Sequence, residues 1–404
     1  MAGAYIHIPF CEHICYYCDF NKVFIEGQPV DDYVAMLLKE MRMVMAEHPE
    51  EKIETVYVGG GTPTTLTPQQ LAVLCQGIRD ILHFDHGEFT FEANPNDLLT
   101  TDKLQVLHDF RVNRLSIGVQ SFNDDVLKRI GRIHRAKDVY TAIGNARKVG
   151  FDNLSIDLIF RLPDQSRDDF LNSLQKALAL DLPHYSTYSL ILERKTIFYN
   201  LMRQGKLRLP TQDVEADMYQ DAIDLMEAHG RHQYEISNFA KTGYQCRHNL
   251  LYWQNDKYFG FGAGAFGYLG RDRYHNYGPI KQYLAPLHAD HLPVLAHHLV
   301  PVSEQIEEEM FLGLRTMAGV NEDRFYRRYH MTVDAVYGET VPELESQGLI
   351  ERQNGYIRLT NRGKFLGNEV FQQFLLDEPT GLMMNHCFGY DKKSNHSWLF
   401  DGTF

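Results

Sequence analysis

The chain has 404 residues, of which 44% are hydrophobic, and a formal net charge of −13 at pH 7. Its length is sufficient for one large hydrophobic core and a smaller second one. The acidic balance disfavours nucleic acid as the main partner, because phosphate binding needs a basic face. No apolar run is long enough to span a bilayer, so only peripheral contact with a membrane stays open. We expect no signal peptide and a cytoplasmic location.

The first half of the chain alternates between strand and helix patterns. Strands are expected at residues 4–8, 55–58, 88–93, 114–119, 153–160 and 184–192. Helices are expected at residues 31–48, 67–82, 101–110, 123–130, 136–149 and 166–180. This alternation predicts parallel βαβ units. Because the unusual residues fall at strand ends, it favours an incomplete α/β barrel with its site at the carboxyl ends of the strands.

The second half is more varied. A helix at 213–229 and a strand at 233–237 are followed by a segment rich in Gly, Tyr and Phe, and then by a helix at 304–314. The patterns at 348–350 and 356–359 predict a two-stranded wing. We therefore divide the chain into a partial barrel, a connecting segment, a small C-terminal α+β domain and a tail without a clear period. Their bounds are 1–240, 241–300, 301–376 and 377–404.

Three of the six cysteines share one short stretch. Cys11, Cys15 and Cys18 have the spacing C-x3-C-x2-C. Three thiolates on a tight loop can hold three irons of a four-iron, four-sulfur cluster and leave the fourth iron open for another ligand. A zinc site completed by His7 or His13 is the alternative. A disulfide is disfavoured, because three cysteines cannot all pair among themselves.

Further polar or permissive residues follow the predicted strands. The run Gly59-Gly60-Gly61-Thr62 comes directly after one strand and lets the backbone approach a ligand closely, although a tight turn would also explain it. Glu92, Gln120, Arg132 and Asp157 lie at or near the ends of later strands. Carboxylates and amides there can bind hydroxyls or an amine, and arginine can pair with a carboxylate. Surface or capping roles are the alternative for each one singly.

The cysteine motif, with an aromatic residue before Cys18, resembles that of radical S-adenosylmethionine (SAM) proteins. The string Tyr5-x-His-Ile-Pro-Phe-Cys11 resembles the family of HemN, the oxygen-independent coproporphyrinogen III oxidase. This resemblance implies an incomplete parallel (β/α)6 radical SAM barrel with a winged-helix-like C-terminal domain, and a [4Fe-4S] cluster on Cys11, Cys15 and Cys18. It also implies the residues that contact SAM, which are Tyr5, Gly60, Gly61, Thr62, Glu92, Gln120, Arg132 and Asp157.

Two departures from the family pattern stand out. Phe20 occupies the place where the oxidase carries a further cysteine, which matches the HemW group of heme chaperones. Relatives usually have Gly-Leu-Pro-Gly where this chain has Arg161-Leu-Pro-Asp164, which puts the shape of that loop in doubt.

The stretch from Cys246 to Trp253 contains the sequence His248-Asn-x-x-Tyr252-Trp253. A histidine can ligate heme iron, and the aromatic residues can stack on a porphyrin, although a lone histidine is usually not a ligand. The sequence resembles the HNxxYW motif of the HemW group, which implies heme binding at His248. Candidate second ligands are Cys246, His275, Met383, Met384, His386 and Cys387.

The leading hypothesis is a heme chaperone that carries a [4Fe-4S] cluster and SAM, binds heme and delivers it to apo-proteins, including those of the respiratory chain. The alternative is a radical SAM decarboxylase of the coproporphyrinogen oxidase type. A radical SAM enzyme acting on another substrate is the third hypothesis. Whether the chain is an enzyme stays open at this point.

Overall fold

The computed structural model describes residues 2–376. Its contacts divide the chain into two compact units. The larger comprises the chain up to residue 233 together with 237–251 and 256–299. The smaller comprises 234–236, 252–255 and the chain from residue 300.

The larger unit is organised around six parallel strands that neighbour one another in chain order. They are β1 (Ala2–Ile8), β4 (Ile53–Gly60), β5 (Glu88–Ala93), β6 (Arg114–Gln120), β7 (Leu154–Phe160) and β8 (His184–Ser189). All six strands predicted from the sequence are present, and the α/β fold is confirmed. Because these strands are parallel, their carboxyl ends meet at one edge of the sheet.

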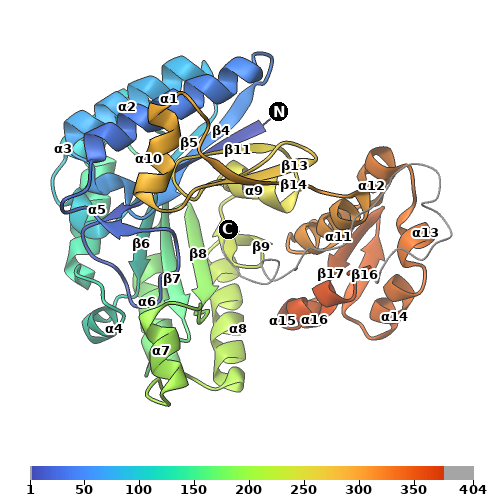
Figure 1. The fold of residues 1–404 in the computed structure, drawn as a ribbon. Helices are drawn as coiled ribbons and strands as arrows, with labels where there is room; N and C mark the ends of the chain where they lie inside the picture. Colours follow the sequence, from blue (N-terminus) through green and yellow to red (C-terminus); the bar gives the residue numbers. More distant parts are fainter. Residues whose placement is uncertain (1, 377–404) are drawn as a thin grey trace. The chain divides into compact units, whose positions relative to one another are not determined.

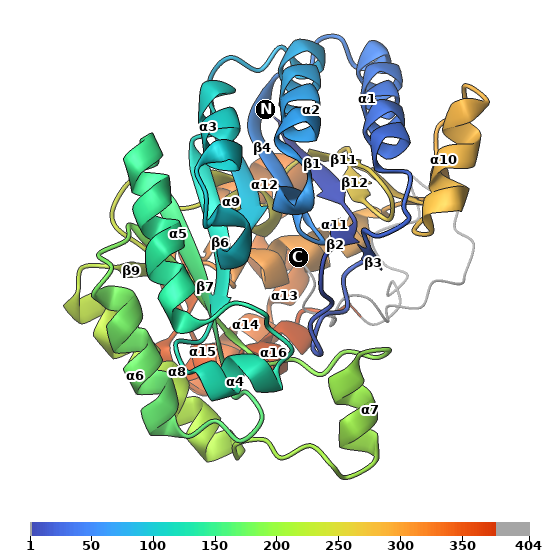
Figure 2. The same ribbon diagram turned by 90° about the vertical axis from the view of Figure 1, so that its left-hand side faces the viewer.

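Helices connect these strands and cover the outer face of the sheet (Figures 1 and 2). They are α1 (Val30–Glu47), α2 (Pro68–Leu82), α3 (Asp102–Asp109), α4 (Asp124–Arg129), α5 (Ala136–Val149) and α6 (Arg167–Leu178), followed by α7 (Ile197–Arg203) and α8 (Gln212–Ala228). The start of α2 shows how the sequence sets a boundary. The Thr67 side chain accepts a hydrogen bond from the backbone N–H of Gln70 at 3.2 Å, and Pro68 occupies the first turn.

The main sheet continues beyond these strands on both sides. Parallel β11 (Tyr258–Phe261) pairs with β1, and the antiparallel strands β12 (Phe266–Tyr268), β13 (Asp272–Asn276) and β14 (Val294–Leu299) follow. On the other side lie β10 (Asn238–Ala240) and β9 (His232–Glu235). The stretch 241–300, treated above as a connecting segment, thus supplies four strands of this sheet, with α9 (Arg247–Trp253) and α10 (Ile280–His288) between them. Among the described residues the outermost strands β14 and β9 do not pair, so the barrel is open.

A buried glutamate ties the 241–300 stretch to α1. The Glu40 carboxylate accepts hydrogen bonds from the Gly262 N–H (2.9 Å), the Asn276 side-chain amide (2.5 Å) and the Tyr283 hydroxyl (2.5 Å). Burial raises the pKa of Glu40 to about 7. These three donors satisfy a carboxylate that apolar packing alone could not accommodate.

The smaller unit is a compact α+β structure, as predicted. Three antiparallel strands have the order β15–β17–β16, and the buried side chains include Phe325 and Ile357. Its elements are α11 (Val302–Gly313), β15 (Val320–Asn321), α12 (Glu322–Tyr329), α13 (Val333–Tyr337), α14 (Thr340–Ser346), β16 (Ile350–Gln353), β17 (Tyr356–Leu359), α15 (Asn361–Phe365) and α16 (Gly367–Gln372). The predicted tail at 377–404 lies outside the described residues.

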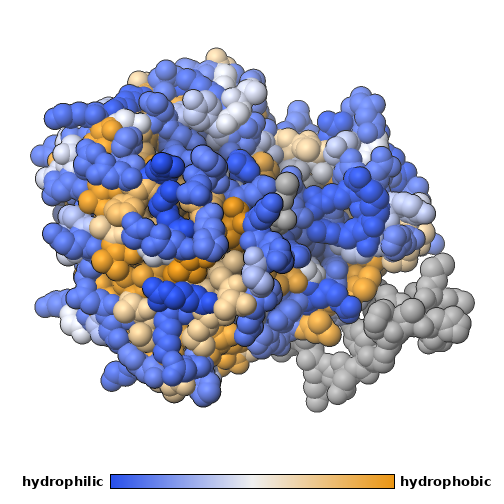
Figure 3. Space-filling view, turned by 90° about the horizontal axis from the view of Figure 1, so that it is seen from above, coloured by the Kyte–Doolittle hydropathy of each residue, from blue (hydrophilic) through white to orange (hydrophobic). Residues whose placement is uncertain are grey.

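The surface combines apolar and hydrophilic areas. One face shows apolar residues gathered in its left-hand part, interrupted by hydrophilic ones (Figure 3). Within residues 2–376, no helix has the length and apolar character needed to cross a bilayer.

Candidate site at the carboxyl ends of the strands

The three cysteines of the motif lie on the loop that follows β1. Cys11 is buried in the short strand β2 (Phe10–Cys11), which pairs with β3 (Val23–Phe24), whereas Cys15 and Cys18 are half-buried on the loop between these strands. Burial raises the pKa of the Cys11 thiol to about 12 and that of Cys18 to about 11. Without a metal these thiols are therefore neutral, and iron would have to displace their protons.

The structure argues against His7 as a zinc ligand. The His7 ring is buried, with Nδ1 2.9 Å from the Tyr5 hydroxyl and Nε2 2.7 Å from the Asn21 carbonyl. Both ring nitrogens are engaged, so His7 is not a ligand. In residues 2–376, no three His, Cys, Asp or Glu side chains converge as a single metal ion requires. A four-iron cluster differs because each cysteine binds a different iron, so the three thiols need not converge on one point.

The glycine run brings the end of β4 against the cysteine loop. Gly60 has a φ of +114°, and a Cβ there would lie 2.5 Å from the His7 ring. A Cβ on Gly61 would lie 2.7 Å from the Phe10 carbonyl oxygen and 3.0 Å from the Cys11 sulfur. Glycine is therefore required at both positions by steric fit, and at Gly60 by its positive φ as well. The Thr62 hydroxyl, 3.8 Å from the Cys11 sulfur, makes a contact to the cysteine that the glycines cannot.

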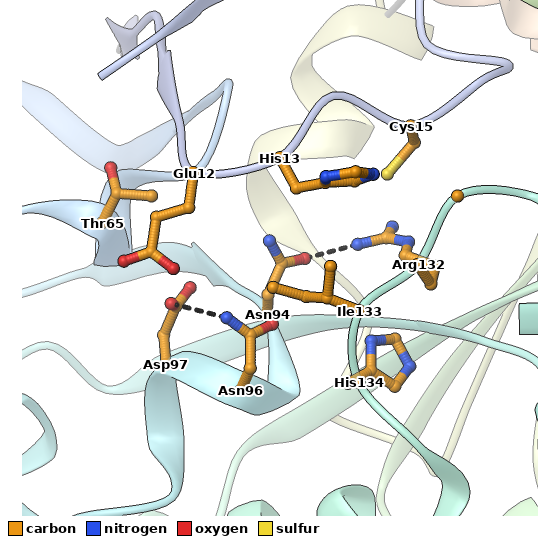
Figure 4. Close-up of a pocket in the computed structure, with 11 residues that line it drawn as sticks. Glu12, His13, Cys15, Thr65, Asn94, Asn96, Asp97, Arg132, Ile133 and His134 are labelled. Atoms are coloured by element: carbon orange, nitrogen blue, oxygen red, sulfur yellow. Dashed lines mark hydrogen bonds between the residues drawn. The ribbon is translucent and has the colours of Figure 1, made fainter. Parts of the chain in front are cut away.

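Hydrogen bonds then connect the cysteine loop to the ends of β5 and β6. Asn94, just after β5, donates to the Thr62 hydroxyl at 3.0 Å and accepts from Arg132 at 2.6 Å. Arg132 also donates to the Tyr17 hydroxyl at 2.8 Å. Arg132, Asn94 and Cys15 line one small pocket together with His13 (Figure 4). The structure thus brings Thr62 and Arg132 together with the cysteine loop.

Two atoms in this area fit an additional ligand. Gln120 Oε1 and Arg132 Nε are buried, and neither makes a hydrogen bond to another of the described residues. Gln120 ends β6 with a φ of +66°, a conformation that costs energy for a residue other than glycine. Such strain and orphaned polar atoms are expected where a bound molecule supplies the missing partner. These observations fit the SAM site that the resemblance implies.

Two carboxylates complete the site at the neighbouring strands. Glu92 of β5 accepts hydrogen bonds from the Tyr57 hydroxyl at 2.8 Å and from the Gly60 N–H at 3.0 Å. Asp157 of β7 accepts from the Ser116 hydroxyl at 3.3 Å. Burial raises the pKa of Glu92 to about 7 and also raises that of Asp157. A cationic ligand near them would favour the charged form of both.

The Arg161–Asp164 loop keeps the backbone shape that glycines would allow. Arg161 has a φ of +61° and Asp164 a φ of +53°. Arg161 forms an ion pair with Glu215 at 3.0 Å, and Asp164 forms one with Arg129 at 3.7 Å. Arg161 and Asp164 therefore retain the left-handed conformation of the glycines that they replace, at a cost in backbone strain. The altered loop sequence leaves Asp157 in place within β7.

This strain makes a testable prediction. Asp164→Ala and Asp164→Gly both remove the exposed ion pair, so that loss cancels when the two variants are compared. We expect the alanine variant to be less stable than the glycine variant by about 1 kcal/mol, because a Cβ disfavours positive φ. Urea unfolding of both variants measures the difference. Equal midpoints would show that the loop relaxes without strain.

His248 of the predicted heme motif is buried at the opposite, amino-terminal end of the strands. The Glu88 carboxylate, at the start of β5, accepts from the backbone N–H groups of Arg247 and His248, both at 2.9 Å. Placing a carboxylate at the first turn of α9 stabilises the helix. The His248 ring is 1% exposed, its Nδ1 lies 2.8 Å from the Thr55 hydroxyl, and it stacks on Tyr57 at 5.3 Å between centroids.

This burial has a direct consequence for heme. A porphyrin can reach the His248 ring only if α9 moves away from β1 and β4, since a Cβ on Gly3 of β1 would already lie 3.1 Å from the ring. Among the proposed second ligands, Cys246 is buried and donates to Glu88, whereas His275 is partly exposed and stacks on Phe266 at 4.6 Å. Met383, Met384, His386 and Cys387 lie outside the described residues.

Sequence patterns missed three residues that matter here. Asn94 joins Thr62 to Arg132, Tyr57 joins Glu92 to His248, and Glu88 holds the start of α9. The position of Asn94 directly after a strand was the one available signal. Tyr57 lies inside β4 and Glu88 begins β5, so neither follows a strand and neither gives such a signal.

The comparisons with known proteins agree with this geometry. The profile of the Radical SAM superfamily matches residues 5–177, and that of the HemN C-terminal domain matches residues 300–366. The structure resembles that of coproporphyrinogen III oxidase (HemN) from Escherichia coli, a radical SAM enzyme, with a TM-score of 0.80. That likeness covers 93% of this chain and 90% of the other at 23% identity, so it establishes the fold. The fold is thus that of a radical SAM protein.

Sequence similarity narrows this class further. The chain is 51% identical to the heme chaperone HemW of Bacillus subtilis over 377 residues, which are 93% of this chain and 99% of the relative. It is 45% identical to the heme chaperone HemW of Lactococcus lactis, over 93% of this chain and 98% of the relative. The chain therefore belongs to the HemW family.

Proposed function

We propose that the chain is a heme chaperone, which binds heme and transfers it to apo-proteins. The observation that carries this proposal is the identity of 51% and 45% to two proteins named heme chaperones, over nearly the whole length of each. Transfer needs an acceptor, and respiratory-chain proteins are the acceptors we propose. These would bring the chain to a membrane surface as a peripheral protein. Free thiols at the cluster loop favour a reducing, cytoplasmic setting.

The cluster and SAM would occupy the site at the carboxyl ends of the strands. Cys11, Cys15 and Cys18 would hold a [4Fe-4S] cluster, which supplies one-electron chemistry when bound. The remaining residues of this proposal are Tyr5, Gly60, Gly61, Thr62, Glu92, Gln120, Arg132 and Asp157. In this proposal the glycines leave room for SAM, and the two carboxylates face its positive groups. Arg132 Nε donates a hydrogen bond to the ligand, and Gln120 Oε1 accepts one from it.

For heme we propose His248 as a binding residue. A neutral imidazole is the form that ligates iron, and burial lowers the pKa of His248 to about 3, so the ring is neutral. Because heme can reach the ring only when α9 moves away from β4, ligation would give up the 2.8 Å contact between Nδ1 and the Thr55 hydroxyl.

A heme titration tests this proposal. Anaerobically reconstituted wild type should give saturable Soret-band binding, and His248→Ala should bind at least about tenfold more weakly. His184→Ala is the matched control, because His184 is also buried and bonded to a hydroxyl, that of Ser155 at 2.7 Å. Equal affinity in His248→Ala and His184→Ala would remove His248 from the heme site. Absence of binding in the wild type would refute the chaperone function.

A further inference from the structure

Tyr57 of β4 lies between the two sites and contacts a key residue of each. Its hydroxyl donates to Glu92 Oε1 at 2.8 Å, and Glu92 belongs to the proposed SAM site. Its ring stacks on His248, with 5.3 Å between centroids and 28° between planes. One side chain therefore joins the carboxylate at one end of the sheet to the imidazole of the heme motif.

The surroundings of Tyr57 leave little room for independent movement. A Cβ on Gly59 would lie 2.8 Å from Glu92 and 3.0 Å from the Tyr57 ring, so the β4 backbone closes against both. The second oxygen of Glu92 is held by the Gly60 N–H at 3.0 Å. On the other side His248 is fixed by Thr55 at 2.8 Å. A change in the strength of the hydrogen bond between Tyr57 and Glu92 therefore alters the packing of the Tyr57 ring against His248.

We propose that Tyr57 couples the two sites, so that SAM bound at Glu92 weakens heme binding at His248. A ligand with an ammonium and a sulfonium group keeps the Glu92 carboxylate ionised. An ionised carboxylate accepts a stronger hydrogen bond from the Tyr57 hydroxyl than a neutral one. The Tyr57 ring is then held more firmly against His248, whereas heme can reach His248 only when that packing opens.

This inference rests on the proposed function, because it assumes that heme binds at His248. Coupling between two ligands is reciprocal, so heme must weaken SAM binding by the same factor. Coupling energies in proteins usually correspond to about 5- to 150-fold in affinity. Tyr57 is thus a positioning residue, and the coupling factor is the quantity that a merely structural residue would not change.

The test is a heme titration of cluster-loaded protein, without reductant, in the presence and absence of saturating SAM. In the wild type we expect SAM to raise the Kd for heme about 5- to 150-fold. Tyr57→Phe keeps the stacked ring and removes the hydroxyl, so heme should still bind, with nearly the same Kd whether SAM is present or not. The matched control Tyr274→Phe removes another buried hydroxyl, which donates to the Gly260 carbonyl, and should keep the wild-type effect of SAM.

The outcomes separate this inference from the proposed function. If the wild type binds heme equally with and without SAM, or more tightly with it, the coupling is refuted and the chaperone function stands. If the effect of SAM persists in Tyr57→Phe, Tyr57 does not carry it. If the wild type binds no heme, both proposals fail. Measuring SAM affinity of the wild type with and without heme checks reciprocity without any variant.

Discussion

Replacing Cys15 with alanine will abolish assembly of the cluster. The loop offers three thiols for three irons, and loss of one leaves two irons without a protein ligand. Reconstituted wild type should contain about four irons per chain, and Cys15→Ala close to none. Iron analysis and the charge-transfer absorbance of the cluster measure this directly.

Cys75→Ala is the matched control for that experiment. Cys75 is fully buried in α2 and lies outside the cysteine loop. Its loss should cost some stability and leave the iron content unchanged. A Cys15→Ala protein that still holds a full complement of iron would contradict the assignment of the three thiols.

Gly60→Ala should strongly weaken SAM binding and leave the fold intact. A Cβ at this position would lie 2.5 Å from the His7 ring, which Tyr5 and Asn21 hold on both nitrogens and which cannot easily move. Overpacking of this kind costs about 1–3 kcal/mol. When this cost opposes SAM binding, the affinity for SAM falls about 5- to 150-fold. Equilibrium dialysis with labelled SAM measures the change.

Gly144→Ala provides the comparison. Gly144 lies in α5, and a Cβ there would meet nothing within 4 Å. We expect unchanged SAM affinity and a gain in stability of up to about 1 kcal/mol, because alanine favours the helix. Similar SAM affinities in the two variants would mean that Gly60 does not border the ligand.

The parallel core of the fold could be predicted because its signals are local. Most of the six strands contain apolar residues in a short run or in alternation, and helices with regular periodicity follow them in the chain; Thr67-Pro68 marks a helix start in the sequence itself. Between 258 and 299 the sequence indicates only loops and irregular strands, and the individual strands could not be placed because they depend on distant partners. Glu40 of α1 and the edge of β1 organise that stretch, and neither is visible in its own residues.

The candidate site was predictable in its residue types and not in its conformation. The spacing of the cysteines and the glycine run identified the loop and the end of β4. The positive φ angles at Gln120 and Arg161 depend on how neighbouring strands pack, which no single-residue preference reveals. The same holds for His248, because its burial follows from contacts with Thr55 and Tyr57, almost 200 positions earlier in the chain.

Strand β5 separates the proposed heme site from the proposed SAM site. Glu88, which holds the start of α9, and Glu92 of the proposed SAM site are four residues apart on this strand, or about 13 Å. Abstraction of a hydrogen atom requires contact between the reacting atoms. A porphyrin held at the amino-terminal end of the strands would therefore lie out of range of radical chemistry at the carboxyl end, and heme could be carried through many cycles without being consumed.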